Sequence, residues 1–464
     1  MTAAFAEIAT APEQGLARSL KPRHVEMIAI GGIIGAGLFV GSSSAIAGIG
    51  PAAILSYAAA GLIVLLVMRM LSEMANAVPG VQSFPEFARL GLGDWAGFLS
   101  GWLYWYFWVV VVAIEAIAGA TILCGWWPVL PVWAVALALT LALTGVNLLS
   151  ARSYGEFEFW LSGLKIAAIL VFILVAIAAI TGVAGGGGTG LANWTAHGGF
   201  APRGALSVAA GVTGVIFALV GAEIATVAAA ESSAGPKVIA KLTLTVAARI
   251  LLFYVVSIAL IVAVVPWTEI VPGQSPFATA LARIGVPGGA LIMQGVVLVA
   301  VLSCLNSGLY VTSRVLHALA LRGDAPRALA VTGGAGVPRR AILFGTVFSL
   351  AALALSIVSP TRAFAFLVNA SGAVMLVLYL LIALAQLRLR ARLEREAPER
   401  LTIRMWWHPY GAIAAILAMV AVLAAMALTP ELSSQFGASA SAVLVMLAGL
   451  VLKRLVGRRR IAVA

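Results

Sequence analysis

The chain is a succession of long apolar runs separated by short polar segments. A run of about 20 apolar residues is long enough for a helix to cross the hydrocarbon core of a bilayer. The pattern therefore predicts an all-α integral membrane protein with twelve transmembrane helices. The candidate spans are 25–47, 52–77, 95–123, 129–149, 156–182, 204–230, 238–266, 288–320, 340–358, 361–386, 408–429 and 433–455, and span 288–320 is expected to continue as a cytoplasmic helix.

Two of these spans contain glycines where an uninterrupted helix would have none. One is "HVEMIAIGGIIGAGLFVGSSSAIAGIG" from His24, and the other is "GALSVAAGVTGVIFALVGAEIATVAAAES" from Gly204. A break near the membrane midplane frees backbone amides and carbonyls, which is tolerated only where that backbone lines a protein-enclosed cavity. Matched broken helices in two halves of a chain indicate a secondary transporter built from an inverted repeat.

Composition and charge agree with a membrane protein. The chain is 62% hydrophobic and 10% charged, with a net charge of +12. With an internal N-terminus, 25 of the 29 lysines and arginines fall on the cytoplasmic side, which is the positive-inside bias. Both termini are therefore predicted to be cytoplasmic. The basic runs Arg388–Arg404 and Lys453–Arg460 are interpreted as topology determinants and contacts to anionic lipid, not as a nucleic-acid surface.

No large soluble domain is expected, and residues 1–23 lack a signal peptide's apolar region. The segment 83–93 is predicted to be a short amphipathic helix on the inner face. The expected organisation is a cytoplasmic tail (1–24), a first inverted repeat of five spans (25–182), an extracellular Gly-rich connector (183–203), a second repeat (204–386), a basic cytoplasmic loop (387–407), two peripheral spans (408–455) and a cytoplasmic tail (456–464).

The first glycine cluster is a candidate ligand site. Gly31, Gly32, Gly35 and Gly37 lie within two turns, and unwinding explains four glycines in seven residues better than close helix packing does. The half-helix that resumes after Gly37 would point its amide-rich positive end into the cavity, where it could hold a carboxylate.

Three of the ionisable residues within the predicted spans are candidates for function. Glu223 follows Gly221 in the second broken span and could carry a proton, although a structural carboxylate bonded to backbone is the alternative. Lys165 lies deep in span 156–182, where its ammonium needs a partner; carbonyls of the first broken span are plausible ones, and snorkelling is the alternative. Glu115 follows Trp108 by seven residues on one helix face, a pair that suits an ammonium ligand or, equally, helix packing.

Other polar groups and missing motifs narrow the function further. Asn306, Ser307, Asn369 and Ser371 are expected to hydrogen-bond between helices. No lysine follows a glycine, so the nucleotide-binding loop of an ATP-driven pump is absent. The four histidines have no metal-ligand spacing, and Cys124 and Cys304 do not suggest a disulfide framework. We therefore expect no metal, no cofactor, no ATP and no enzymatic activity.

The sequence resembles the amino acid permeases of the amino acid–polyamine–organocation superfamily, from about His24 to the end of the last span. Within that superfamily it is most similar to bacterial 4-aminobutyrate (GABA) permeases. The segments that carry the resemblance are "GLFVGSSSAIAGIGP" (37–51), "LYWYFWVVV" (103–111), "LALTGVNLLSARSYGEFEFW" (141–160), "GAEIATVAAAES" (221–232) and "LNSGLYVTSR" (305–314).

The resemblance implies the leucine-transporter fold and proton-coupled uptake of an amino acid across the bacterial inner membrane. It implies that Glu223 is linked to protonation and gating, and that Lys165 stands in for sodium. It places substrate contacts at Ile33, Gly35, Ala36, Gly37, Phe217 (an aromatic gate) and Val220. Ala36 departs from the family pattern, because several relatives carry a serine whose hydroxyl helps to hold the carboxylate.

Three functions follow as hypotheses from these observations. The first is proton symport of GABA or a related ω-amino acid, with Glu115 as a substrate contact. The second is a permease or exchanger for aromatic, proline or small neutral α-amino acids. The third is an amino acid sensor that does not transport, which the short tails disfavour.

Overall fold

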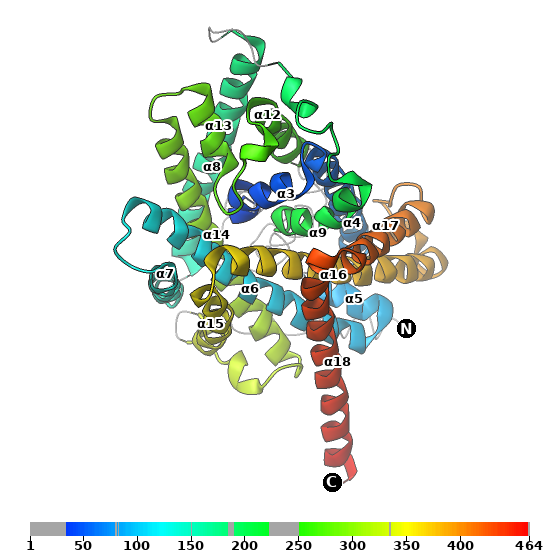
Figure 1. Ribbon diagram of the computed structural model, residues 1–464. Helices are drawn as coiled ribbons and strands as arrows, with labels where there is room; N and C mark the ends of the chain where they lie inside the picture. The colour runs from blue at the N-terminus through cyan, green and yellow to red at the C-terminus, as the bar shows by residue number, and fades with distance from the viewer. Residues whose placement is uncertain are drawn as a thin grey trace.

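The structure is a computed structural model that describes residues 34–78, 81, 83–149, 151–183, 190–221, 250–333 and 336–462. Every regular element among these residues is helical (Figure 1). Among the described residues, eight helical segments are long and apolar enough to cross a membrane. They are α4 (Ala53–Ala77), α6 (Asp94–Trp126), α8 (Ala151–Thr181), α14 (Gly289–Leu321), α15 (Arg339–Leu353) together with the turn that continues it to Ile357, α16 (Pro360–Glu396), α17 (Tyr410–Leu428) and α18 (Ser433–Ala462).

Shorter apolar helices occupy the other four predicted spans. They are η1 (Gly37–Gly41) continued by α3 (Ser42–Ile49), α7 (Val132–Asn147), α9 (Gly204–Leu219), and η3 (Ile250–Val256) continued by α12 (Ser257–Val264). At 1.5 Å per residue none of these alone covers about 30 Å of hydrocarbon. All four lie close to residues outside the described ranges, so the count of twelve crossings stays a prediction. The all-helical membrane fold is confirmed.

Short helices connect the long ones. The predicted amphipathic segment is α5 (Phe84–Leu92). Helix α13 (Pro276–Ile284) was not predicted, although Pro276 at its first position and left-handed Gly285 at its end are ordinary helix boundary signals. The remaining turns are η2 (Ala192–Trp194), η4 (Trp267–Glu269), η5 (Arg327–Ala330), η6 (Ala354–Ile357), η7 (Pro398–Arg400) and η8 (Pro430–Leu432).

Two helices run further than the apolar pattern predicted. Helix α16 continues to Glu396 through residues expected to begin a loop at 387, and with 37 residues it is longer than α14, which was expected to be the longest. Helix α18 continues to Ala462 rather than ending at 455. Arginine and leucine are both good helix formers, so the helices extend past the apolar runs that would cross the bilayer.

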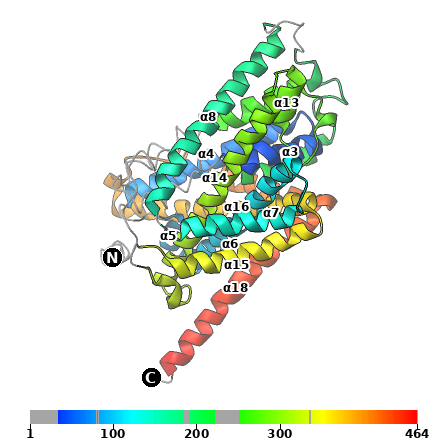
Figure 2. The same ribbon diagram turned by 90° about the vertical axis from the view of Figure 1, so that its left-hand side faces the viewer.

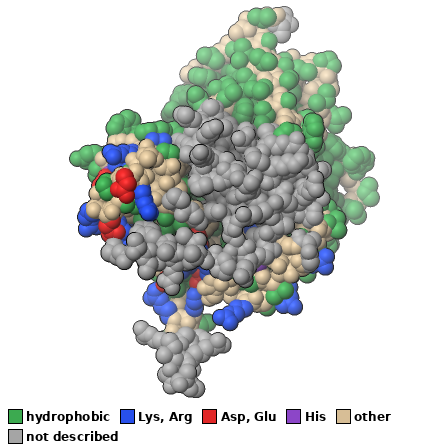
Figure 3. Space-filling view, turned by 180° about the vertical axis from the view of Figure 1, so that it is seen from behind, with side chains coloured by type: hydrophobic (Ala, Val, Ile, Leu, Met, Phe, Trp, Pro, Cys, Tyr) green, Lys and Arg blue, Asp and Glu red, His purple; other side chains and the backbone are tan. Residues whose placement is uncertain are grey.

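Helix α6 forms the centre of the bundle. It is largely buried and packs against α14, α16, α5, α7 and α15. Helices α8 and α18 lie at the periphery and project from opposite ends of the bundle (Figure 2). Their exposed side chains are mainly apolar, including Leu174 and Leu444. The upper part of the face in Figure 3 is also largely hydrophobic, whereas the lysines and arginines visible there lie lower. Such a surface suits contact with lipid.

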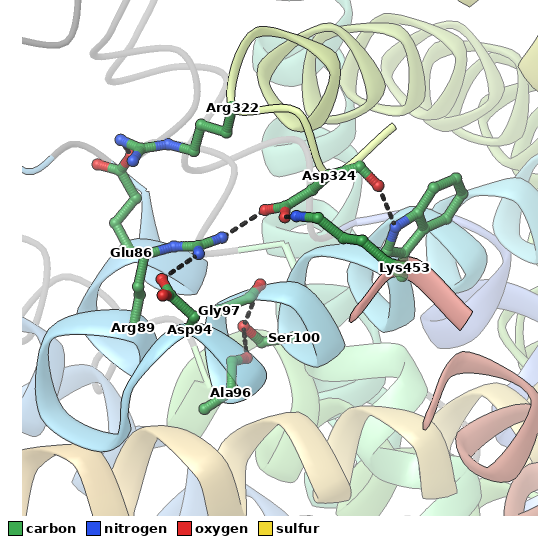
Figure 4. A network of polar contacts seen from close by, with 10 residues as sticks. Glu86, Arg89, Asp94, Ala96, Gly97, Ser100, Arg322, Asp324 and Lys453 are labelled. Atoms are coloured by element: carbon green, nitrogen blue, oxygen red, sulfur yellow. Dashed lines mark hydrogen bonds and ion pairs between the residues drawn. The ribbon is translucent and has the colours of Figure 1, made fainter. Parts of the chain in front are cut away.

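A buried carboxylate joins four elements at the end of the bundle where α14 finishes. Asp324 accepts hydrogen bonds from Arg89 on α5 and from Lys453 on α18, as Figure 4 shows. Its backbone carbonyl accepts a hydrogen bond from Trp102 on α6, 3.1 Å away. Arg89 also pairs with Asp94 at 2.7 Å. These contacts hold α5, the first turns of α6 and the outer half of α18 together.

A second buried carboxylate ties α4 to α16. Glu73 accepts hydrogen bonds from Arg390, from Gln386 at 2.7 Å, and from the backbone amide of Met405. Arg390 and Lys453 belong to the basic runs for which the sequence predicted lipid contacts. In the structure both pair with carboxylates of the protein itself.

Candidate functional site

The first broken span resumes as a helix at the position the glycines indicated. Ile34 and Gly35 are not helical, Ala36 is the N-cap, and Gly37–Gly41 form a π-helical turn before α3. An added Cβ at Gly37 would lie 2.6 Å from the Cα of Ala218, so a glycine is needed for the two broken helices to approach this closely. Ile33 lies outside the described residues.

The second broken span ends where the sequence placed the break. Helix α9 stops at Leu219, and Val220 is extended with ψ of 145°. Gly221 has φ of +130°, a conformation that side chains disfavour. Residues 222–249, which include Glu223, lie outside the described residues.

The two breaks border one small cavity of about 20 Å³. Five residues nominated from the sequence line it: Gly35, Gly37, Glu115, Phe217 and Val220. The other lining residues are Phe107, Trp108, Val111, Ala218 and Cys304. Trp108 and Glu115 thus share a helix face, as the seven-residue spacing predicted. Sequence reasoning missed Cys304 as a cavity residue, because nothing in an apolar run marks which face of α14 meets the breaks.

The carboxylate of Glu115, a residue of α6, lies at the start of the helix that resumes after the first break. The backbone N–H of Ala36 donates to both carboxylate oxygens, at 3.1 and 3.0 Å. Glu115 is 1% exposed, and an added Cβ at Gly35 would lie 2.7 Å from its Oε1. The positive end of a helix stabilises a carboxylate, so this contact is favourable. The backbone amide of Ala36, which the sequence analysis expected to contact the substrate, therefore already binds the carboxylate of Glu115.

A second buried ionic cluster surrounds Lys165 on α8. Its Nζ lies 2.8 Å from Oγ of Ser303 and 3.4 Å from Oε1 of Glu158. Both charged side chains have no exposed surface. The described partners are thus a carboxylate and a hydroxyl, whereas the sequence suggested carbonyls of the first broken span, most of which lie outside the described residues. Snorkelling of Lys165 to an interface is excluded by its complete burial.

Glu158 is a functional candidate that the sequence analysis did not single out. It accepts hydrogen bonds from Ser303, from Ser162 at 3.1 Å and from Ser307 at 3.4 Å. A signal was available, because Glu158 and Lys165 are seven residues apart and so share one helix face. Glu115 and Lys165 are therefore not the only buried ionisable groups near the breaks.

The two sites meet on α14. Ser303 contacts the Lys165–Glu158 pair, and the next residue, Cys304, lines the cavity beside Glu115. A movement of α14 would therefore change both sites together. Of the other nominated polar residues, Asn306 accepts a hydrogen bond from Asn147 on α7 at 2.7 Å, as expected of an interhelical contact. Ser371 differs, because its hydroxyl bonds to Leu367 of its own helix at 2.7 Å.

A larger cavity of about 500 Å³ lies between α3, α9, α16 and the turn before α18. Asn369 lines it, together with Arg203 and Glu431, which are both exposed. Asn369 and Arg390 lie about 30 Å apart along α16, at 1.5 Å per residue. That distance equals the hydrocarbon thickness of a bilayer, so this cavity and the Glu73 contacts are far enough apart to lie near opposite membrane faces.

Comparison with known proteins identifies close relatives. A family model described as amino acid permease matches residues 24–463. The chain is 49% identical to a gamma-aminobutyric acid permease of Bacillus subtilis over 89% of both chains. It is 47% identical to a probable GABA permease of Pseudomonas aeruginosa, covering 90% of this chain and 88% of the relative. It is 38% identical to an aromatic amino acid transport protein of Corynebacterium glutamicum, covering 89% and 90%.

A solved structure has the same overall fold. The crystal structure of a mutant manganese transporter from Eremococcus coleocola aligns over 94% of both chains with a TM-score of 0.57. The two sequences are 13% identical, so this likeness concerns the fold alone.

Proposed function

Because the chain belongs to the amino acid permease family, whose members are transporters rather than enzymes, we propose that it imports GABA or a related ω-amino acid by proton symport. The observation that carries the substrate class is the level of identity. Two relatives named as GABA permeases are 49% and 47% identical over nearly the whole chain, against 38% for the aromatic amino acid transporter.

The chemical groups around the cavity between the breaks suit the two ends of an ω-amino acid. It combines the amide-rich start of a helix at Ala36 with a carboxylate at Glu115 and aromatic walls from Trp108 and Phe217. A helix N-terminus binds carboxylates, and an aromatic face beside a carboxylate attracts an ammonium group. Three methylenes separate the carboxylate of GABA from its ammonium group. GABA therefore needs a donor for its carboxylate and, several ångströms away, an acceptor for its ammonium group. Ile33, Gly35, Gly37 and Val220 would supply backbone contacts.

Proton coupling is proposed to depend on two sites. Glu223 would take up and release the proton beside the second break. Lys165 would fill a cation site with its own ammonium, so that no sodium ion is needed. Its burial against Glu158 and Ser303 supports this role, because an ammonium can remain charged in such a place only with charged and polar partners.

The membrane arrangement follows from charge and geometry. We place the chain in the bacterial inner membrane with both termini in the cytoplasm, the 500 Å³ cavity facing outside, and Asp324 and Glu73 at the cytoplasmic ends of their helices. The excess of basic residues on one side supports this orientation. The two inverted repeats, 25–182 and 204–386, joined by the connector 183–203, remain part of this proposal, as does contact with anionic lipid.

Uptake into proteoliposomes tests the function. Purified protein would be supplied with a panel of radiolabelled amino acids under an imposed pH gradient, a sodium gradient or neither. Accumulation of GABA driven by an inward proton gradient is the expected result. Uptake of phenylalanine or proline without GABA would support the permease for α-amino acids instead, gradient-independent counterflow alone would indicate an exchanger, and binding without transport would indicate a sensor.

A further inference from the structure

The amide expected to receive a substrate carboxylate is already bonded to a carboxylate of the protein. Ala36 donates to both oxygens of Glu115, and Glu115 is almost completely buried. We propose that Glu115 is an internal stand-in for the substrate carboxylate, and that the substrate displaces it from Ala36 on binding. This inference rests on the proposed function, because it concerns how the same cavity takes up an ω-amino acid.

The size of the cavity requires a displacement. A volume of about 20 Å³ is close to the roughly 10–15 Å³ that one water molecule needs. A zwitterion with several non-hydrogen atoms enters only when a lining group moves. Glu115 is the one charged side chain among the described lining residues. Two carboxylates cannot share the Ala36 amide, because like charges in a water-poor site repel strongly.

The displaced carboxylate then needs a new partner. The ammonium group of an ω-amino acid provides one several bonds away from the substrate carboxylate. A simple carboxylic acid provides none and would leave Glu115 buried without a counter-charge, which is strongly unfavourable. The exchange therefore selects for a ligand with two separated charges. The indole N–H of Trp108, which is buried beside the cavity and has no hydrogen-bond partner in the described part of the chain, is a further donor for the incoming carboxylate.

A ligand that lacks the ammonium group separates this proposal from a simple contact role. Butyrate has the carbon chain and carboxylate of GABA but no amine. We would measure the dissociation constants of GABA and butyrate for the wild-type protein and for Glu115→Gln by calorimetry in detergent. The amide of glutamine has no charge, so it competes weakly for Ala36 and needs no counter-charge when displaced. We expect the ratio of butyrate affinity to GABA affinity to rise by about tenfold or more.

Glu73→Gln is the matched control, because it neutralises another almost fully buried carboxylate that does not line the cavity and lies outside both sites. Its butyrate-to-GABA ratio should equal that of the wild type. If Glu115→Gln does not fold, Glu115→Asp replaces it; the shorter side chain cannot reach Ala36, and the ratio should shift in the same direction. A ratio that stays constant in the folded variants overturns the exchange.

Binding and uptake by the wild-type protein distinguish a failure of the proposed displacement of Glu115 from a failure of the proposed function. Wild-type protein that binds and accumulates GABA, with no change in the ratio on substitution, refutes the exchange but leaves the function standing. If wild-type protein ignores GABA but takes up another ω-amino acid, that amino acid and its deaminated acid replace GABA and butyrate, and the same change in ratio is expected. Wild-type protein that takes up only α-amino acids refutes the substrate class and also the exchange, because an α-ammonium lies beside the substrate carboxylate and is no separate partner for the displaced Glu115.

Discussion

The Lys165–Glu158 pair gives the sharpest prediction about stability. Lys165→Met removes the ammonium and keeps an unbranched side chain of similar length. Glu158 would then stay buried without its counter-charge, with the hydroxyls of Ser162, Ser303 and Ser307 as its remaining partners. We therefore expect Lys165→Met to be one of the most destabilising single substitutions in α8.

The magnitude follows from the burial of both groups. Removing one member of a fully buried ion pair typically destabilises a protein by about 3–5 kcal/mol, mainly because the other charge is left uncompensated. The three hydroxyls around Glu158 place the expected value near the lower limit, about 3 kcal/mol. Glu158→Gln should be milder, because Lys165 keeps its contact with the Ser303 hydroxyl, and the amide oxygen of glutamine can still accept a hydrogen bond from the ammonium group.

The double variant decides whether the pair interacts. Lys165→Met with Glu158→Gln leaves no uncompensated charge, so it should be more stable than Lys165→Met alone by about 1–3 kcal/mol. Denaturant unfolding in detergent, followed by tryptophan fluorescence, would give the four values of a double-mutant cycle. Additive effects would refute the reasoning, since they would mean that Glu158 and Lys165 do not stabilise each other.

Three further expectations concern transport. Glu223→Gln should abolish accumulation against a gradient while sparing counterflow, and a variant that accumulates substrate like the wild type would show Glu223 to be structural. Replacing sodium by choline should leave wild-type uptake unchanged, because Lys165 fills the cation site; sodium-dependent uptake would contradict that assignment. Gly37→Ala should lose transport and about 1–3 kcal/mol of stability, because its Cβ would meet the backbone of Ala218, whereas Gly48→Ala, with open space around it, should do neither.

The apolar pattern was sufficient to predict the fold class and most helices. Long apolar runs must form helices in a bilayer, because every backbone polar group has to be satisfied within its own segment. The ends of α16 and α18 were predicted too short for a related reason. Hydropathy marks where the lipid ends, whereas a helix continues as long as its residues favour it and its polar side chains find partners, as Arg390 and Lys453 do.

The breaks in the two helices could also be predicted from the positions of the glycines in the sequence. Only glycine adopts the conformation of Gly221 without strain, and only glycine lets the helix at residue 37 approach Ala218 so closely. The seven-residue spacing of Trp108 and Glu115 likewise placed these two residues on one face of α6. These are properties of single helices or single residues, and local sequence determines them.

The contacts between side chains of different helices could be identified only from the tertiary structure. The sequence named Lys165 but not Glu158 or Ser303, and it named Ala36 and Glu115 without indicating that they bond to each other. Helical spacing fixes which residues share a face, but the rotation and depth of each helix depend on the packing of all its neighbours. For that reason the sequence determined the helices and their breaks, and only the packed bundle decided which carboxylate meets which donor.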